Sequence, residues 1–316
     1  MLAYCVKRVI AGLVVLILLS MVVFVMLQAA PGSVESALLG GGIRSPEVEK
    51  AIEIKYHLND SLFSQYLAWL GGVIHGDFGN SIIYREPVVD AIGGRLLVTA
   101  QLGMLSFGFA VALGLGLGVL AANRPRGVLD RSLVATSVVG TAVPTFVVGV
   151  LLVYVFSVSL GWFPVSGPGS SGADRLWHLI LPALALGFSE YALVLKLARA
   201  GVLSNKEQDA FLFARARGVR GWLLVRRYEL RTGLIPLLTS LALLLAYMLT
   251  GAVLVEVVFG IPGIGSMLVQ AVQKKDIPVV QALTLLTGAI VLTLNLLADI
   301  SYQIIDPRVR ITESTP

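Results

Sequence analysis

The sequence predicts an all-α, polytopic membrane protein with six transmembrane helices, and two properties of its 316 residues lead to this class. Hydrophobic residues make up 56% and charged residues only 14% of the chain, whereas soluble domains carry about 25% charged residues. The apolar residues also gather in runs long enough to cross the roughly 30 Å of hydrocarbon in a bilayer. These runs must be helical, because a bilayer offers the backbone no water and the runs lack the alternation of barrel strands.

Six apolar runs define the predicted spans. They cover residues 9–27, 97–121, 133–160, 179–200, 234–258 and 281–304. We interpret the first run as a retained anchor, since no cleavage site closes a short apolar region as in a signal peptide. Gly114 and Gly118 have the spacing at which two helices approach closely. Pro144 removes a hydrogen bond inside the third run and predicts a kink, which either shapes a pathway or fits a neighbouring helix.

The basic residues predict the orientation of these spans. With the N-terminus inside and the spans alternating, sixteen of the 24 Lys and Arg residues fall on the inner side. Cytoplasmic flanks carry such an excess. We therefore expect a multi-pass protein of the cell membrane with both termini in the cytoplasm and with lipid around its spans.

Two connections are longer than ordinary loops and divide the chain. Residues 29–96 are predicted to form a small external subdomain after the N-terminal helix of residues 1–28, with helical spacing near Tyr66 and a turn at 76–79. Residues 97–316 are predicted as a five-helix core. Within that core, residues 201–233 mix arginines with aromatic side chains and form a cytoplasmic loop between the fourth and fifth helices.

The sequence carries no recognisable signature of catalytic or metal chemistry. The three histidines lack metal-pair spacing, the single cysteine cannot form a disulfide, and no H-E-x-x-H or G-x-S-x-G motif occurs. No glycine precedes a lysine, so a P-loop is excluded and any ATP chemistry belongs to another chain. The glycine-rich stretch 260–266 is expected to be a turn between helices. We expect no cofactor, no metal and no nucleic-acid partner.

One charge inside a predicted span is unusual. Glu190 lies in the fourth run, where a charge needs a partner or a watery cavity. Lys196 lies on a different face of the same helix, so the two do not pair simply. We consider Glu190 and Pro144 candidate pathway residues, and we assign Lys196, Arg199 and Asp299 to snorkelling at the inner ends of the spans.

Several motifs along nearly the whole chain resemble the dipeptide and oligopeptide class of ABC importer permeases. They are Tyr66-Leu67-Ala68-Trp69-Leu70-Gly71-Gly72 with Gly76-Asp77-Phe78-Gly79, the segment 161–167, the segment 209–218 with Leu234-Ile235-Pro236, the segment 258–265, and Asp306-Pro307-Arg308-Val309-Arg310. The resemblance implies a subunit of an ATP-driven importer, forming half of the pathway for di- or oligopeptides, that performs no bond chemistry itself. It also implies a second homologous permease, two cytoplasmic ATPase subunits and an external substrate-binding protein.

The inner loop resembles the cytoplasmic coupling loop of such importers. Ala214-Arg215-Ala216-Arg217-Gly218 is similar to the peptide-importer version, although Leu212 and Phe213 depart from the general E-A-A pattern. Apolar and basic side chains on a short helix suit a groove of a partner. The residues expected to couple to the ATPases are Asp209, Phe211, Phe213, Ala214, Arg215, Gly218 and Trp222.

Other functions stay open at this point. Relatives of this permease type are also expected to carry nickel or oligosaccharides. A membrane-embedded enzyme and an ATP-independent channel are the rival classes, and a substrate turned over by the purified chain alone would identify the enzyme.

Overall fold

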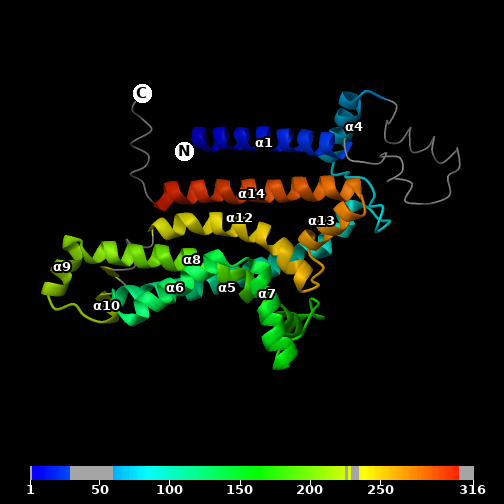
Figure 1. Ribbon diagram of the computed structural model, residues 1–316. Helices are drawn as coiled ribbons and strands as arrows, with labels where there is room; N and C mark the ends of the chain where they lie inside the picture. The colour runs from blue at the N-terminus through cyan, green and yellow to red at the C-terminus, as the bar shows by residue number, and fades with distance from the viewer. Residues whose placement is uncertain (1, 29–59, 225–226, 229–234, 306–316) are drawn as a thin grey trace. The chain divides into compact units, whose positions relative to one another are not determined.

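The computed structural model describes residues 2–28, 60–224, 227–228 and 235–305, and within them the backbone is helical almost throughout (Figure 1). No strand forms in these residues, and one isolated bridge pairs Asn80 with Pro87. The helices are α1 (Leu2–Gln28), α4 (Leu62–Ile74), α5 (Val88–Asn123), α6 (Val128–Ala142), α7 (Thr145–Leu152), η1 (Val153–Ser159), α8 (Gly172–Lys206), α9 (Asp209–Ala216), α10 (Trp222–Leu224), α12 (Ile235–Val258), α13 (Ile264–Gln273) and α14 (Ile277–Ile305). The predicted all-α class is confirmed.

Five of the six predicted apolar runs each fall on one helix, and the third, 133–160, is divided among α6, α7 and η1. Four helices in the described part of the chain are long and apolar enough to cross a membrane: Val6–Gln28, Val88–Asn123, Gly172–Lys206 and Ile277–Ser301. The pair Val128–Ala142 and Thr145–Ser159 counts as a fifth if it is one bent span, and α12 contributes the shorter apolar stretch Leu244–Val258. The total of six membrane crossings stays a prediction.

The helices extend past the apolar runs from which they were predicted. α5 begins at Val88 and α8 begins at Gly172, ahead of the predicted starts at 97 and 179. Their first turns carry Asp90 and Asp174, whose negative charges favour a helix N-terminus but end an apolar run. Residues 88–96 form the first turns of α5, and the extent of the external subdomain predicted over 29–96 stays a prediction. Of that subdomain, residues 29–59 lie outside the described residues.

The kink predicted at Pro144 is confirmed, and it divides the third run. The two helices on either side of it are bent by 106°. The backbone N–H of Val143 donates to Val139 O at 3.0 Å, and the next N–H is missing because the residue is proline. Pro144 caps α7 instead, and its carbonyl accepts from the N–H of Val147 at 3.0 Å. The break is thus built into the backbone at a single residue.

The chain divides into two compact units, of which residues 100–261 and 293–316 form one. Its centre is α8, which contacts α6, α7 and α12 (Figure 1). α5 crosses α8 at glycines: a Cβ on Gly114 would lie 2.5 Å from Val194 Cβ, and one on Gly118 would lie 2.8 Å from Ala198 Cβ. These distances leave no room for a side chain, so the predicted small-residue packing is confirmed.

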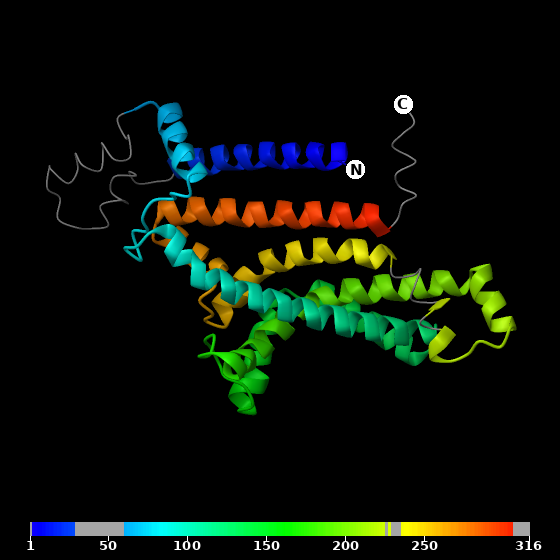
Figure 2. The same cartoon turned by 180° about the vertical axis from the view of Figure 1, so that it is seen from behind.

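Residues 1–99 and 262–292 form the other unit. In it, α4 lies against α1, where Tyr66 packs on Phe24 with ring centroids 5.6 Å apart and its hydroxyl shares a 2.8 Å hydrogen bond with Ser20 (Figure 2). The turn predicted after α4 is confirmed, with Gly76 and Gly79 at φ +80° and +79°. Glycine tolerates this conformation because it has no Cβ.

A buried carboxylate holds a loop of the same unit in place. Asp276 is fully buried and accepts hydrogen bonds from Ser81 Oγ at 2.5 Å and from the backbone N–H of Ile83 at 3.0 Å.

The glycine-rich stretch 260–266 joins α12 to α13, as predicted for a turn between helices.

Candidate functional site

The predicted coupling segment begins where α8 ends. Lys206 is the last residue of α8, and Gln208 is extended with φ −78° and ψ 143°, so the chain changes direction before α9. The carbonyl of Gln208 accepts the backbone N–H groups of Phe211 and Leu212 at 3.0 and 3.2 Å, which starts the new helix. Figure 1 shows α9 at the end of α8, with α10 beside it.

Side-chain hydrogen bonds anchor this junction. Lys206 Nζ donates to the carbonyl of Ala122 and to Asn123 Oδ1, both at 2.9 Å. These acceptors lie at the C-terminus of α5, where a positive charge is favourable and the last carbonyls lack helical partners. Gln208 Nε2 donates to Asn205 Oδ1 at 3.0 Å, and Asn205 is buried. The base of α9 is therefore attached to both α8 and α5.

α9 has a buried face and an exposed face. Phe211 and Ala214, three residues apart, are each 5% exposed. Leu212 and Phe213 are 52% and 67% exposed, although both are apolar. Phe211 therefore packs inside the chain, and Phe213 with Leu212 forms the apolar surface available to a partner.

A glycine ends α9. Gly218 has φ +85°, its N–H donates to Arg215 O at 3.0 Å, and the N–H of Val219 donates to Ala214 O at 3.1 Å. This pair of bonds is a Schellman motif, in which glycine is the preferred residue because other side chains are strained at positive φ. The chain therefore turns at Gly218, directly after α9.

Charged side chains surround the exposed apolar residues. Asp209 and Arg215 on α9 and Arg217 and Arg220 after it are all exposed. Trp222 begins α10, and its side chain lies outside the described part of the structure. We call residues 209–224 the α9–α10 surface.

The two candidate pathway residues lie away from this surface. Glu190 is on α8, sixteen residues before its end, which corresponds to about 24 Å along the helix axis. Its side chain is half-buried and forms no hydrogen bond or ion pair with another described residue. Pro144 is at the break between α6 and α7, and α7 contacts α8. α8 is thus the element that links the pathway candidates to the α9–α10 surface.

An ion pair that the sequence reasoning missed joins α6 to α8. Arg199 Nε donates to Asp130 Oδ1 at 2.6 Å, and Arg199 NH2 donates to Asp130 Oδ2 at 2.8 Å. The Asp130 carboxylate is buried and also accepts the backbone N–H of Arg126 at 2.8 Å. Arg199 was assigned to snorkelling, but it holds two helices together through a bidentate pair.

Comparison with known proteins decides the family. The family described as "Binding-protein-dependent transport system inner membrane component" matches residues 114–311, and its N-terminal counterpart matches residues 1–103. The chain belongs to this family.

Relatives of this permease span its full length. The oligopeptide transport system permease protein AppB of Bacillus subtilis (strain 168) is 36% identical, with 98% of this chain and 99% of the relative covered. The glutathione transport system permease protein GsiC of Escherichia coli (strain K12) is 34% identical, with 98% and 99% covered.

Solved structures show the same fold. The MetNI methionine ABC transporter in inward-facing conformations has a chain with TM-score 0.54 and 17% identity, covering 67% of this permease and 94% of that chain. An amino acid ABC transporter crystallised with histidines gives TM-score 0.52 at 18% identity, with 67% and 92% covered.

The family confirms the main functional prediction. This chain is the integral inner-membrane component of an ABC importer, a transport subunit and not an enzyme. Permeases of this family work with ATPase and substrate-binding protein partners, and ATP hydrolysis lies in the partner subunits. The predicted roles of individual residues stay predictions.

Proposed function

We propose that this permease forms half of the translocation pathway of a peptide importer, paired with a second homologous permease. Two cytoplasmic ATPase subunits power the complex, and an external binding protein supplies the substrate. The relatives named for oligopeptide and glutathione transport, each covered over nearly its full length, support a peptide substrate.

The observation that carries the coupling role is the exposed part of α9. Leu212 and Phe213 are apolar, more than half exposed and flanked by arginines. A short amphipathic helix of this kind suits a groove on a soluble partner. Gly218 turns the chain directly after α9, and Lys206 anchors the start of this short helix to α5. We assign the ATPase contact to the exposed face of α9.

The same contacts provide a route from the ATPases to the pathway. A displacement of α9 would be passed to α8 through the hydrogen bond between Gln208 and Asn205, and from α8 to α6 through the Arg199–Asp130 ion pair. α6 ends at the Pro144 break, where a change of angle disrupts no helical hydrogen bond. Glu190, on α8 itself, then faces either the pathway or a neighbouring helix of the second permease.

The orientation is part of the proposal. The α9–α10 surface, with the inner ends of α5, α6 and α8, is placed on the cytoplasmic side together with both termini, because these flanks hold most of the basic residues. In a Cys5→Ser background, a cysteine at exposed Glu207 should be protected from an impermeant thiol reagent in intact cells, and one at exposed Lys274 should react. Labelling in the opposite pattern would reverse the orientation.

Substrate uptake tests the proposal as a whole. The complex is reconstituted in vesicles with its cognate binding protein, and uptake of labelled dipeptide, oligopeptide, nickel and oligosaccharide is compared with and without ATP. ATP-dependent uptake of peptide alone is expected. ATP-dependent uptake of nickel or of a sugar, with none of peptide, would replace the substrate and keep the importer.

A further inference from the structure

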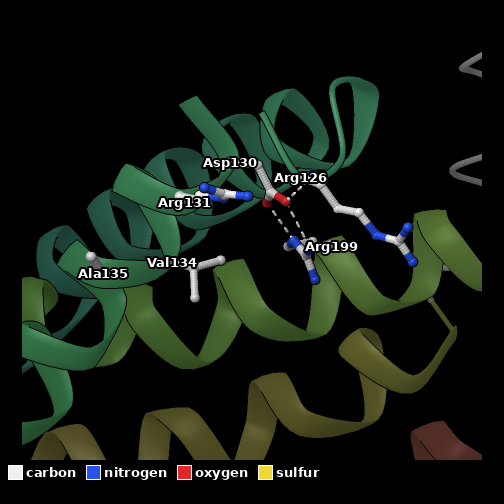
Figure 3. A pocket seen from close by; sticks show the side chains of 6 residues that line it. All are labelled: Arg126, Asp130, Arg131, Val134, Ala135 and Arg199. Carbon is white, nitrogen blue, oxygen red and sulfur yellow. Dashed lines mark hydrogen bonds and ion pairs between the residues drawn. The ribbon is translucent and has the colours of Figure 1, made fainter. Parts of the chain in front are cut away.

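A basic cavity lies beside the ion pair between α6 and α8. It has a volume of about 380 Å³ and is lined by Arg126, Asp130, Arg131, Val134, Ala135 and Arg199 (Figure 3). Three positive charges and one negative charge leave this lining with a net charge of +2. The volume is at the low end of ligand-binding pockets, so a headgroup fits and a whole lipid does not.

Two of the three guanidinium groups are available to a ligand. Asp130 is engaged on both carboxylate oxygens by Arg199 and by the backbone N–H of Arg126. The side chains of Arg126 and Arg131 are exposed, and neither makes a hydrogen bond or ion pair with another described residue. Figure 3 shows them on either side of the Asp130–Arg199 pair in that view. The single acidic group of the cavity is thus occupied while two cations face solvent.

An apolar track leaves this cavity along α6. Val134 lies three residues after Arg131 and Val138 seven residues after it, positions that share one helix face. Val138 is 54% exposed and lies about 10 Å along the axis from Arg131. α6 is part of a bent helix pair that is apolar enough to form one span. In the orientation proposed above, on which this inference rests, the start of α6 lies at headgroup depth and the track runs toward the hydrocarbon.

We propose that this cavity binds the phosphate of an anionic phospholipid, with Arg126 and Arg131 on the headgroup and an acyl chain along Val138. Basic pockets between spanning helices at the cytoplasmic surface are suited to such headgroups. A soluble anion makes no use of the apolar track. An acidic loop of a cytoplasmic partner would pair with the two arginines but has no need of an apolar track that continues to Val138. The lipid would rest against both α6 and α8 beside the pair that joins them.

Lipid binding to the purified complex tests this site. Native mass spectrometry measures the retention of phosphatidylglycerol and of phosphatidylcholine with the same acyl chains. The test variant is the double substitution Arg126→Gln and Arg131→Gln, which leaves the Asp130–Arg199 pair in place. The control is Arg124→Gln, an exposed neighbouring arginine that does not line the cavity.

Phosphatidylglycerol should bind in preference to phosphatidylcholine. Removing each arginine of the cavity should weaken the binding of phosphatidylglycerol roughly fivefold, so the double variant should bind it about 30-fold more weakly. Arg124→Gln should bind phosphatidylglycerol with nearly wild-type affinity. Val138→Gln should weaken the binding of phosphatidylglycerol, because the acyl chain loses its apolar contact, and leave the binding of glycerol phosphate unaffected.

Four results would overturn the proposal. A fivefold loss in Arg124→Gln, the same loss per removed charge as in the double variant, would indicate only diffuse surface charge. Equal retention of the two lipids would exclude a headgroup site. Glycerol phosphate that displaces phosphatidylglycerol at equal concentration would identify a site for soluble phosphate. Loss of complex assembly with unchanged lipid retention would identify a contact with a protein partner.

Discussion

Replacing Phe213 with alanine should weaken ATPase binding without harming the permease itself. The side chain is 67% exposed, so little of its packing inside the chain is lost. Full burial of a phenylalanine contributes about 1.5–3 kcal/mol. Docking can bury at most the exposed two thirds, so the interface should lose about 1–2 kcal/mol, which corresponds to a Kd roughly 5- to 30-fold higher.

Two substitutions serve as controls for this prediction. Phe63 on α4 is 65% exposed, almost the same as Phe213, but it lies in the other unit of the chain. Phe63→Ala should leave ATPase affinity unchanged. Phe211→Ala removes a ring that is 5% exposed, so it should lower the stability of the α9 region by about 3–5 kcal/mol.

The assay titrates purified ATPase subunits onto the permease in lipid nanodiscs and measures Kd together with substrate-stimulated hydrolysis. Wild-type affinity in Phe213→Ala would refute the docking role of the exposed ring. An equal loss in Phe63→Ala would show that the effect is not specific to α9.

Three further substitutions test other parts of the argument. Gly218→Val places a β-branched residue at φ +85°, which should destabilise the turn by about 1–2 kcal/mol or more and uncouple ATP hydrolysis from uptake. Gly218→Asn should retain most of the coupling, because asparagine tolerates this backbone conformation. Equal coupling in the two variants would contradict a backbone role for Gly218. Gly114→Ala should lower the thermal midpoint by overpacking worth about 1–3 kcal/mol, whereas Gly116→Ala, where a Cβ meets nothing within 4 Å, should not; equal midpoints would refute the close crossing. Glu190→Gln should reduce uptake in vesicles while the complex still assembles; undiminished uptake would show that the charge is dispensable.

Local features could be predicted from the sequence because their cause is local. The apolar runs locate the helices, and Pro144 breaks one because it lacks a backbone N–H wherever it lies. Gly218 adopts positive φ after a helix for a similarly local reason. Helix ends such as that of α5 at Val88 were placed too late because hydropathy marks the hydrocarbon and not the end of backbone hydrogen bonding.

Long-range features could not be predicted in this way. Asp130 and Arg199 are 69 residues apart, and nothing in either neighbourhood indicates the other. Phe211 and Phe213 looked equivalent as anchors, because an eight-residue helix has two turns and its pattern does not show which face is covered. Only the packing of α9 against the rest of the chain makes one buried and the other exposed.

The close helix crossings limit how the unit around α8 can move. At Gly114, Gly118 and Gly187, an added Cβ would lie within 2.9 Å of a neighbouring helix, so α5 and α8 have no space to slide past each other. Packed elements of this kind move as rigid bodies about hinges instead of deforming continuously. The break at Pro144 is where a hinge needs no helical hydrogen bond to be disrupted. This arrangement favours transport in which α5 and α8 move together and the angle between α6 and α7 changes.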